Sequence, residues 1–207
     1  MVYEPTLCLS LNVRGLRYNK KREIIKQFLN NKKLDIICLQ ETYFVEQDHK
    51  EWSALFPNYQ FFASPGRINS NGLITLIGKN SFSNATVLHK EDRILIISCT
   101  NNDETYVVCN IYSPSDSEAS KRHFYKQITT VIKNLNLSAS AGIILAGDFN
   151  TAAKIDNISG TDHNNHTIRE FTNIMTELDL YDTWRVMNHN SREYSWSRWD
   201  AKKKIDR

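Results

Sequence analysis

Six short apolar runs, separated by turn residues and by three amphipathic stretches, constrain the fold of this 207-residue chain most strongly. The runs expected to form strands are 7–13, 35–39, 72–77, 93–99, 106–111 and 142–146. Helical spacing of apolar residues predicts helices over about 20–31, 116–135 and 167–178. The first helix indicates a parallel crossover, whereas the middle strands have hairpin spacing. This mixture predicts an α/β sandwich of two packed mixed sheets with helices outside.

Composition excludes several other classes of protein. Hydrophobic residues make up 41% of the chain and charged residues 24%, which is the balance of a globular domain rather than a disordered or fibrous chain. A chain of this length can bury one sizeable core, so we expect a single domain over residues 1–207. The net charge of +3 is too small to identify a partner. No apolar run approaches the roughly 20 residues of a membrane helix, so we expect no membrane partner.

The four cysteines lie in apolar segments, without a CxxC pair or a nearby pair of histidines. They are Cys8, Cys38, Cys99 and Cys109. This usage predicts reduced, buried thiols in an intracellular protein and argues against a zinc site.

The most informative segment is 142–150, an apolar strand that ends in Gly-Asp-Phe-Asn. If the chain stays extended there, Asp148 and Asn150 point the same way. An acid can orient and deprotonate a water molecule, and an amide can donate a hydrogen bond to a phosphate oxygen. The pair therefore suits phosphoester hydrolysis. A capped turn after a strand explains the same residues equally well.

Three other expected strands carry polar residues at their ends. Glu41 supplies a carboxylate of the kind that holds Mg²⁺, although it could also be an exposed acid at a strand exit. Asn12 interrupts an apolar run and needs a hydrogen-bond partner, for which we expect the metal-binding carboxylate or its water. Tyr112 closes another run, where its hydroxyl can contact a phosphate or its ring can pack in the core.

These strand-end motifs, in this order, make the chain similar to the exonuclease-endonuclease-phosphatase superfamily, which includes apurinic/apyrimidinic endonucleases and pancreatic-type deoxyribonuclease. More narrowly, essentially the whole chain resembles the endonuclease domain of a non-LTR (LINE-type) retrotransposon. The motifs of this narrower resemblance are Leu11–Leu16, Leu39–Thr42, Leu145–Asn150, Tyr194–Ser197 and Lys204–Arg207. The resemblance implies a four-layer α/β sandwich. It also implies a Mg²⁺-dependent nuclease, with Mn²⁺ as a possible substitute, that nicks double-stranded DNA and leaves a 3′-hydroxyl to prime reverse transcription.

The resemblance also implies a role for each matching residue. Asn12 and Glu41 match metal-site positions, and Tyr112 and Asn150 match phosphate contacts. Asp148 matches the acid that activates water.

One further match marks a departure from the family. Asp206 matches an acid that orients a catalytic histidine, and in the family that histidine lies in a later Ser-Asp-His strand. None of the six histidines of this chain follows a Ser-Asp pair, so we assign that role to none of them. We therefore expect a domain truncated at its C-terminus, without its last strand, whose activity the sequence leaves open.

The candidate DNA contacts combine basic and aromatic residues. Arg14 follows the first strand, and the segment 195–204 holds two tryptophans and four basic residues. Within that segment, Ser195 and Trp199 are the expected contacts, since such residues suit phosphate neutralisation and base stacking. The alternative is a solvated turn between strands.

Two other functions stay open at the level of sequence. One is a phosphatase or phosphodiesterase of the same superfamily, because the core motifs do not identify the group that is esterified to the phosphate. The other is a catalytically inactive DNA-binding fragment. The narrower resemblance implies a longer polyprotein with a reverse transcriptase, and a location in the nucleus.

Overall fold

The computed structural model describes residues 5–67, 69–151, 165–189, 191, 194–197 and 204–206. The chain forms two compact units. The first holds the residues up to Tyr112 together with Leu137–Asp148. The second holds Ser113–Asn136 and the residues from Phe149 onward.

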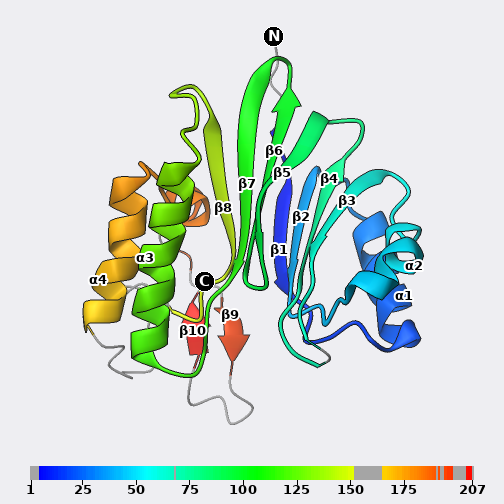
Figure 1. Cartoon of the computed structure of the whole chain (residues 1–207), viewed down its shortest axis with the longest axis horizontal. Coiled ribbons are helices and arrows are strands. Elements are labelled where there is room, and N and C mark those ends of the chain that lie inside the picture. The colour runs from blue at the N-terminus through cyan, green and yellow to red at the C-terminus, as the bar shows by residue number, and fades with distance from the viewer. Residues whose placement is uncertain are drawn as a thin grey trace. The chain divides into compact units, whose positions relative to one another are not determined.

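Two four-stranded mixed sheets make up most of the first unit (Figure 1). The first sheet, in spatial order, contains β1 (Cys8–Asn12), β2 (Ile36–Gln40), β4 (Leu73–Gly78) and β3 (Tyr59–Ser64). The second contains β5 (Ser83–Glu91), β6 (Ile94–Asn101), β7 (Glu104–Tyr112) and β8 (Gly142–Asp148). Each sheet has one parallel pair, β1 with β2 and β7 with β8, and its other pairs are antiparallel.

The register of the two parallel pairs places the polar strand ends together. Asn12 lies opposite Gln40 in the first sheet, and Tyr112 lies opposite Asp148 in the second. Because parallel strands end at the same edge of a sheet, each pair presents its polar residues at one edge.

An apolar core lies between the two sheets. It joins Ile36, Cys38, Leu73 and Ile77 of the first sheet to Leu95, Ile97, Cys99 and Val108 of the second. All five residues of β2 are buried. Alternate side chains of a strand face opposite sides of the sheet, and both sides of β2 are covered. Ile36 and Cys38 face the second sheet, whereas Ile37 and Leu39 pack toward the helices.

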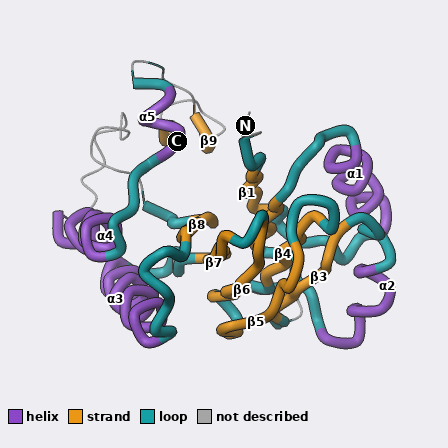
Figure 2. Tube along the Cα trace, turned by 90° about the horizontal axis from the view of Figure 1, so that it is seen from above, coloured by secondary structure: helices purple, strands orange, loops and turns teal. Residues whose placement is uncertain are grey.

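Helices cover the other face of the first sheet. They are α1 (Asn19–Asn30), the 3₁₀ turn η1 (Glu46–Asp48) and α2 (His49–Ser53), and α1 and α2 lie on one side of β3 and β4 in Figure 2. Leu29 of α1 and Trp52 of α2 are both buried against this face. Phe44 meets Trp52 edge to face, with ring centroids 5.6 Å apart.

The second unit contains α3 (Glu118–Asn134), α4 (Asn165–Glu177), α5 (Thr183–Met187), β9 (Tyr194–Ser197) and β10 (Lys204–Asp206). Ser117 caps α3 by accepting a hydrogen bond from the backbone N–H of Ser120 at 3.0 Å. Helices α3 and α4 pack together, with the rings of Tyr125 and Phe171 at 5.8 Å. Strands β9 and β10 form an antiparallel pair.

All six predicted strands and all three predicted helices are present, with ends shifted by a few residues. The parallel first crossover and the middle hairpins are confirmed. Strands β3 and β5 and the short helices α2 and α5 were not predicted. No helix in the described residues is long and apolar enough to cross a membrane.

The expectation of buried thiols is confirmed for three cysteines and wrong for the fourth. Cys38, Cys99 and Cys109 are buried, but Cys8, the first residue of the edge strand β1, is exposed. A hydrogen bond with Cys38 lowers the pKa of the Cys8 thiol.

Candidate active site

The ends of β1 and β2 carry Asn12 and Glu41. The backbone that follows each of these strands includes residues in the left-handed conformation. Arg14, Glu41 and Tyr43 have φ of 47°, 51° and 58°. This conformation costs a residue other than glycine on the order of 1 to 2 kcal/mol. The two loops hold each other in place, since Gly15 N donates to the Glu41 carbonyl at 2.6 Å. Strained backbone of this kind concentrates at functional sites.

Asn12 makes the bond that joins the two sheets at this edge. Its Nδ2 donates to Asp148 Oδ2 at 2.8 Å, and its Oδ1 accepts from the Arg14 backbone N–H at 3.0 Å. The partner of the Asn12 side chain is therefore the Asp148 carboxylate, and not the Glu41 carboxylate that the sequence suggested. A fixed amide donor of this kind orients the Asp148 carboxylate.

Tyr112 joins the sheets a second time. Its hydroxyl donates a hydrogen bond to Glu41 Oε1, and only 7% of the residue is exposed. Burial raises the pKa of the Tyr112 phenol well above its usual range. The hydrogen bond to Glu41 and the negative charges of Glu41 and Asp148 raise this pKa further. The phenol therefore stays protonated at neutral pH and remains a hydrogen-bond donor.

Arg93, which sequence analysis did not single out, holds the other side of Tyr112. Its guanidinium lies 4.8 Å from the centroid of the Tyr112 ring, and its Nη1 donates to the Tyr112 carbonyl at 3.1 Å. The Tyr112 N–H donates in turn to the Arg93 carbonyl at 3.0 Å. Arg93 is a single arginine in the turn between β5 and β6, so neither a motif nor a periodicity marks it.

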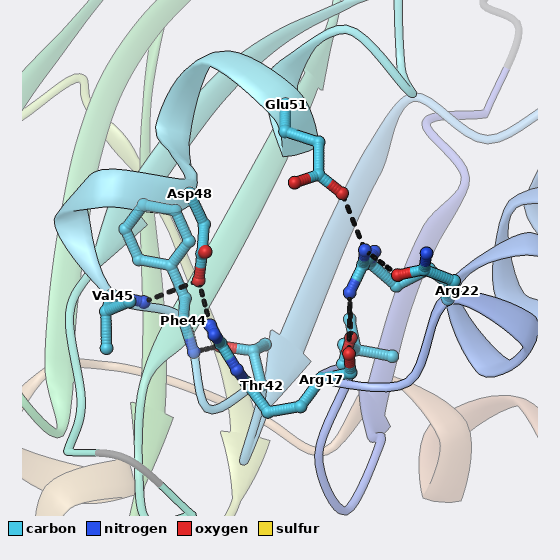
Figure 3. A network of polar contacts seen from close by, with 9 residues as sticks. Arg17, Arg22, Thr42, Phe44, Val45, Asp48 and Glu51 are labelled. Atoms are coloured by element: carbon cyan, nitrogen blue, oxygen red, sulfur yellow. Dashed lines mark hydrogen bonds and ion pairs between the residues drawn. The ribbon is translucent and has the colours of Figure 1, made fainter.

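A polar network behind the β1 loop fixes that loop to the helices (Figure 3). Arg22 of α1 is 8% exposed and donates to the carbonyls of Leu16 at 2.8 Å and Arg17 at 2.9 Å. It also forms an ion pair with Glu51 of α2 at 2.6 Å, and Arg17 forms one with Asp48. A buried guanidinium is stable here because its donors are satisfied.

The loop after Glu41 is fixed in the same way. Thr42 is fully buried, and its Oγ1 accepts from the Phe44 N–H at 3.3 Å. The Thr42 N–H donates to the Gly72 carbonyl at 3.0 Å, and its carbonyl accepts from the Leu16 N–H at 2.9 Å. Glu41 therefore stands on a segment held by both neighbouring loops.

Asn150 belongs to the second unit and departs from the expected geometry. Its φ is 47°, so the chain is not extended there and the alternation expected for Asp148 and Asn150 does not apply. Its Nδ2 donates to the Ser113 carbonyl at 2.7 Å.

The remaining predicted site residues are only partly described. Arg14 is exposed next to Asn12. Ser195 lies in β9, and the backbone of Asp206 in β10 pairs with Tyr194. Trp199 lies outside the described residues.

The donor set fits a hard divalent cation. Glu41, Asp148 and the Asn12 amide supply oxygen atoms, the ligands that Mg²⁺ prefers. Within the described ranges, no basic side chain forms an ion pair with Glu41. The same residues contain no cluster of three or more His, Cys, Asp or Glu side chains that could hold a metal. Oxygen ligands of this kind suit Mg²⁺, which keeps several water ligands.

Comparison with known proteins gives concordant matches. The sequence model of the Endonuclease/Exonuclease/phosphatase family matches residues 9–207. DNA-(apurinic or apyrimidinic site) endonuclease 2 from Xenopus laevis is 26% identical over 197 residues. That match covers 74% of this chain, and the chain spans only 38% of the length of that relative.

Two solved structures share the fold. The AP endonuclease LMAP from Leishmania major superposes with a TM-score of 0.75 at 18% identity, covering 96% of this chain and 77% of the other. An AP endonuclease from Archaeoglobus fulgidus superposes with a TM-score of 0.74 at 20% identity, covering 96% and 80%. The predicted fold class, two mixed sheets flanked by helices, is confirmed.

Proposed function

Because this chain belongs to the endonuclease/exonuclease/phosphatase family, we propose that it is a metal-dependent nuclease that hydrolyses phosphodiester bonds of DNA. The observation that supports this function best is the Asn12–Asp148 hydrogen bond, which holds an acid at the polar edge of both sheets. In this proposal Asp148 orients a water molecule and accepts its proton as the water attacks phosphorus and the bond between phosphorus and the 3′ oxygen breaks. Asn12 keeps the carboxylate in that orientation.

Glu41 and Asn12 would hold Mg²⁺, with Mn²⁺ as a substitute. A bound divalent cation supplies positive charge that stabilises the charge developing on the phosphate oxygens. Tyr112 and Asn150 are each proposed as hydrogen-bond donors to phosphate. The protonated state of Tyr112 suits this role, because a phenolate could not donate.

The finer assignment rests on the motif resemblance. We propose that the enzyme nicks one strand of double-stranded DNA and leaves a 3′-hydroxyl that primes retrotransposon reverse transcription, as part of a polyprotein with a reverse transcriptase in the nucleus. Arg14, Ser195 and Trp199 are the proposed DNA contacts. Asp206 keeps its proposed place as the match to the acid that in the family orients a catalytic histidine, a role that we assign to no histidine of this chain.

The test is nicking of supercoiled plasmid in Mg²⁺ and in EDTA. Asp148→Asn keeps the size of the side chain and removes the base, so we expect the rate to fall about 100-fold or more. Asp103→Asn makes the same chemical change in the exposed β6–β7 turn, at the other end of β7, and should leave the rate unchanged. Extension of the nick by a DNA polymerase checks that a 3′-hydroxyl is left.

Other results would assign a different function. Hydrolysis of a phosphate monoester without plasmid nicking would identify a phosphatase. Salt-sensitive DNA binding without any cleavage in Mg²⁺ or Mn²⁺ would identify a binding module.

A further inference from the structure

A pair of buried amides bridges the two sheets directly behind the candidate site. Asn110 of β7 is fully buried and Gln40 of β2 is 1% exposed. Gln40 Nε2 donates to Asn110 Oδ1 at 2.8 Å. Asn110 Nδ2 lies 3.0 Å from the Ile74 carbonyl and 3.2 Å from Thr75 Oγ1. Every one of these partners of Asn110 belongs to the first sheet, whereas Asn110 belongs to the second.

Such a pair is unusual in a core that is mostly apolar. Burying an amide is unfavourable unless its donors and acceptors are paired, and a well-packed leucine would fill similar space. Here the amide oxygen and the amide nitrogen of Asn110 both have partners. The network is therefore satisfied, and it adds directional bonds where apolar packing alone is non-directional.

The position of the pair relates it to the site. Gln40 directly precedes Glu41 and lies opposite Asn12 in the β1–β2 register. Asn110 lies two residues before Tyr112 on the same strand, so both side chains face the first sheet. The pair thus joins the strand that carries Glu41 to the strand that carries Tyr112.

We propose that Asn110 is a positioning residue, which fixes the first sheet against the second so that Glu41 and Asn12 meet Tyr112 and Asp148. Two further bonds across this edge, Asn12 to Asp148 and Tyr112 to Glu41, involve groups that must exchange partners when substrate and metal bind. The Asn110 bonds lie behind the site and need not change during turnover. The expected effect on kcat rests on the proposed nuclease function, whereas the expected effect on the site distances does not.

The test uses Asn110→Leu, which keeps similar bulk and removes every cross-sheet bond of the amide. Val108→Ala is the matched control, because Val108 is fully buried on the same face of β7 and its loss weakens packing while sparing the amides. Crystal structures of both variants give the Asn12–Asp148 and Tyr112–Glu41 distances. We expect both distances to exceed 3.5 Å in Asn110→Leu and to persist as hydrogen bonds in Val108→Ala.

Plasmid nicking gives the second measurement. Asn110→Leu should lower kcat about 10- to 100-fold with KM for DNA changed less than about threefold, because misplacement of reacting groups by about 1 Å costs this much. Val108→Ala should keep kcat. If Asn110→Leu does not fold, Gln40→Met removes the bond to Asn110, together with the Gln40 bonds to Ser10 and the Cys38 carbonyl within the first sheet, and should lower kcat in the same direction.

The possible results separate the two proposals. Unchanged site distances in Asn110→Leu overturn the positioning role, whether or not the wild-type chain cleaves DNA. If the distances lengthen in Asn110→Leu but the wild-type chain does not nick DNA, the nuclease function is overturned and the positioning role is supported. Equal losses of kcat in Asn110→Leu and Val108→Ala would show that general destabilisation is the cause, and would also overturn it.

Discussion

At the scale of single residues, the candidate site depends on side chains that are each held from two sides. Asn12 bonds to Asp148 with its nitrogen and to the Arg14 backbone with its oxygen. Tyr112 is held by Glu41 at its hydroxyl and by Arg93 at its ring face. Groups fixed in this way lose little entropy when a substrate binds, which is the physical basis of preorganisation.

We predict that removing Arg93 slows cleavage by releasing Tyr112. Arg93→Gln loses the cation–π contact, which is worth about 0.5 to 2 kcal/mol, so kcat should fall about three- to tenfold. Arg93→Lys keeps a cation and should recover part of the loss. Arg169→Gln, at an exposed position of α4, removes the same charge and should not change kcat. A loss confined to KM would instead make Arg93 a DNA contact.

At the scale of elements, the ends of strands matter more than their middles. Strand β8 reaches Asp148 through Gly147, whose φ is 151°. A Cβ atom added at Gly147 would lie 2.1 Å from the Ile111 carbonyl oxygen of β7. The close approach of β7 and β8 therefore requires glycine just before the proposed catalytic acid.

Gly147→Ala should lower the free energy of unfolding by about 2 kcal/mol or more and reduce nicking, because both the backbone and Asp148 must move. Gly142→Ala is the matched change in the same strand. Its added Cβ would lie 3.3 Å from the edge of the Tyr106 ring, so its cost should be within about 1 kcal/mol. Urea unfolding and the nicking rate measure both variants, and equal effects would contradict the explanation.

The elements that the sequence predicted were those with a strong apolar signal. The run at β2 is buried on both faces and is recognisable as a core strand. Strand β5 was missed because most of its residues are exposed and its pairing with β6 has two register shifts, which erase the period-two pattern. Strand β3 was missed because it is a half-buried edge strand in which Phe61 and Phe62 are consecutive.

The site was predictable as a set of strand ends but not as a set of contacts. Asn12 and Asp148 are 136 residues apart in sequence, and only the packing of two sheets brings them together. Arg93 and Asn110 act through tertiary contacts that leave no local pattern. The roles of Asn150, Ser195, Trp199 and Asp206 stay predictions.

At the scale of the whole molecule, stability depends on buried positions of the second sheet that include ionisable thiols. Burial raises the pKa of Cys99 to about 11 and that of Cys109 to about 12, from an ordinary value of 9.0. As the pH rises, these thiols therefore ionise in the unfolded chain at a lower pH than in the folded protein. The stability that the neutral thiols contribute is therefore fully present below pH 9 and is lost as the pH rises toward 12.

We expect the free energy of unfolding to fall by a few kcal/mol between pH 9 and pH 12, since each pKa unit corresponds to about 1.4 kcal/mol. Cys109→Ala should make this dependence shallower. Val107→Ala, another buried truncation in β7, should lower stability equally at every pH. Chemical unfolding at several pH values distinguishes the two, and parallel curves for both variants would contradict the role of the thiol.

The left-handed backbone at Glu41 has a consequence for how this protein can change. Glycine or asparagine suits that conformation better than glutamate, so replacing Glu41 by either relaxes the backbone while removing the proposed metal ligand. The same conflict holds at Arg14, a proposed DNA contact with φ of 47°. Selection for thermal stability alone would therefore replace Glu41 and Arg14 early. Where a lineage retains both residues, selection for activity has kept them.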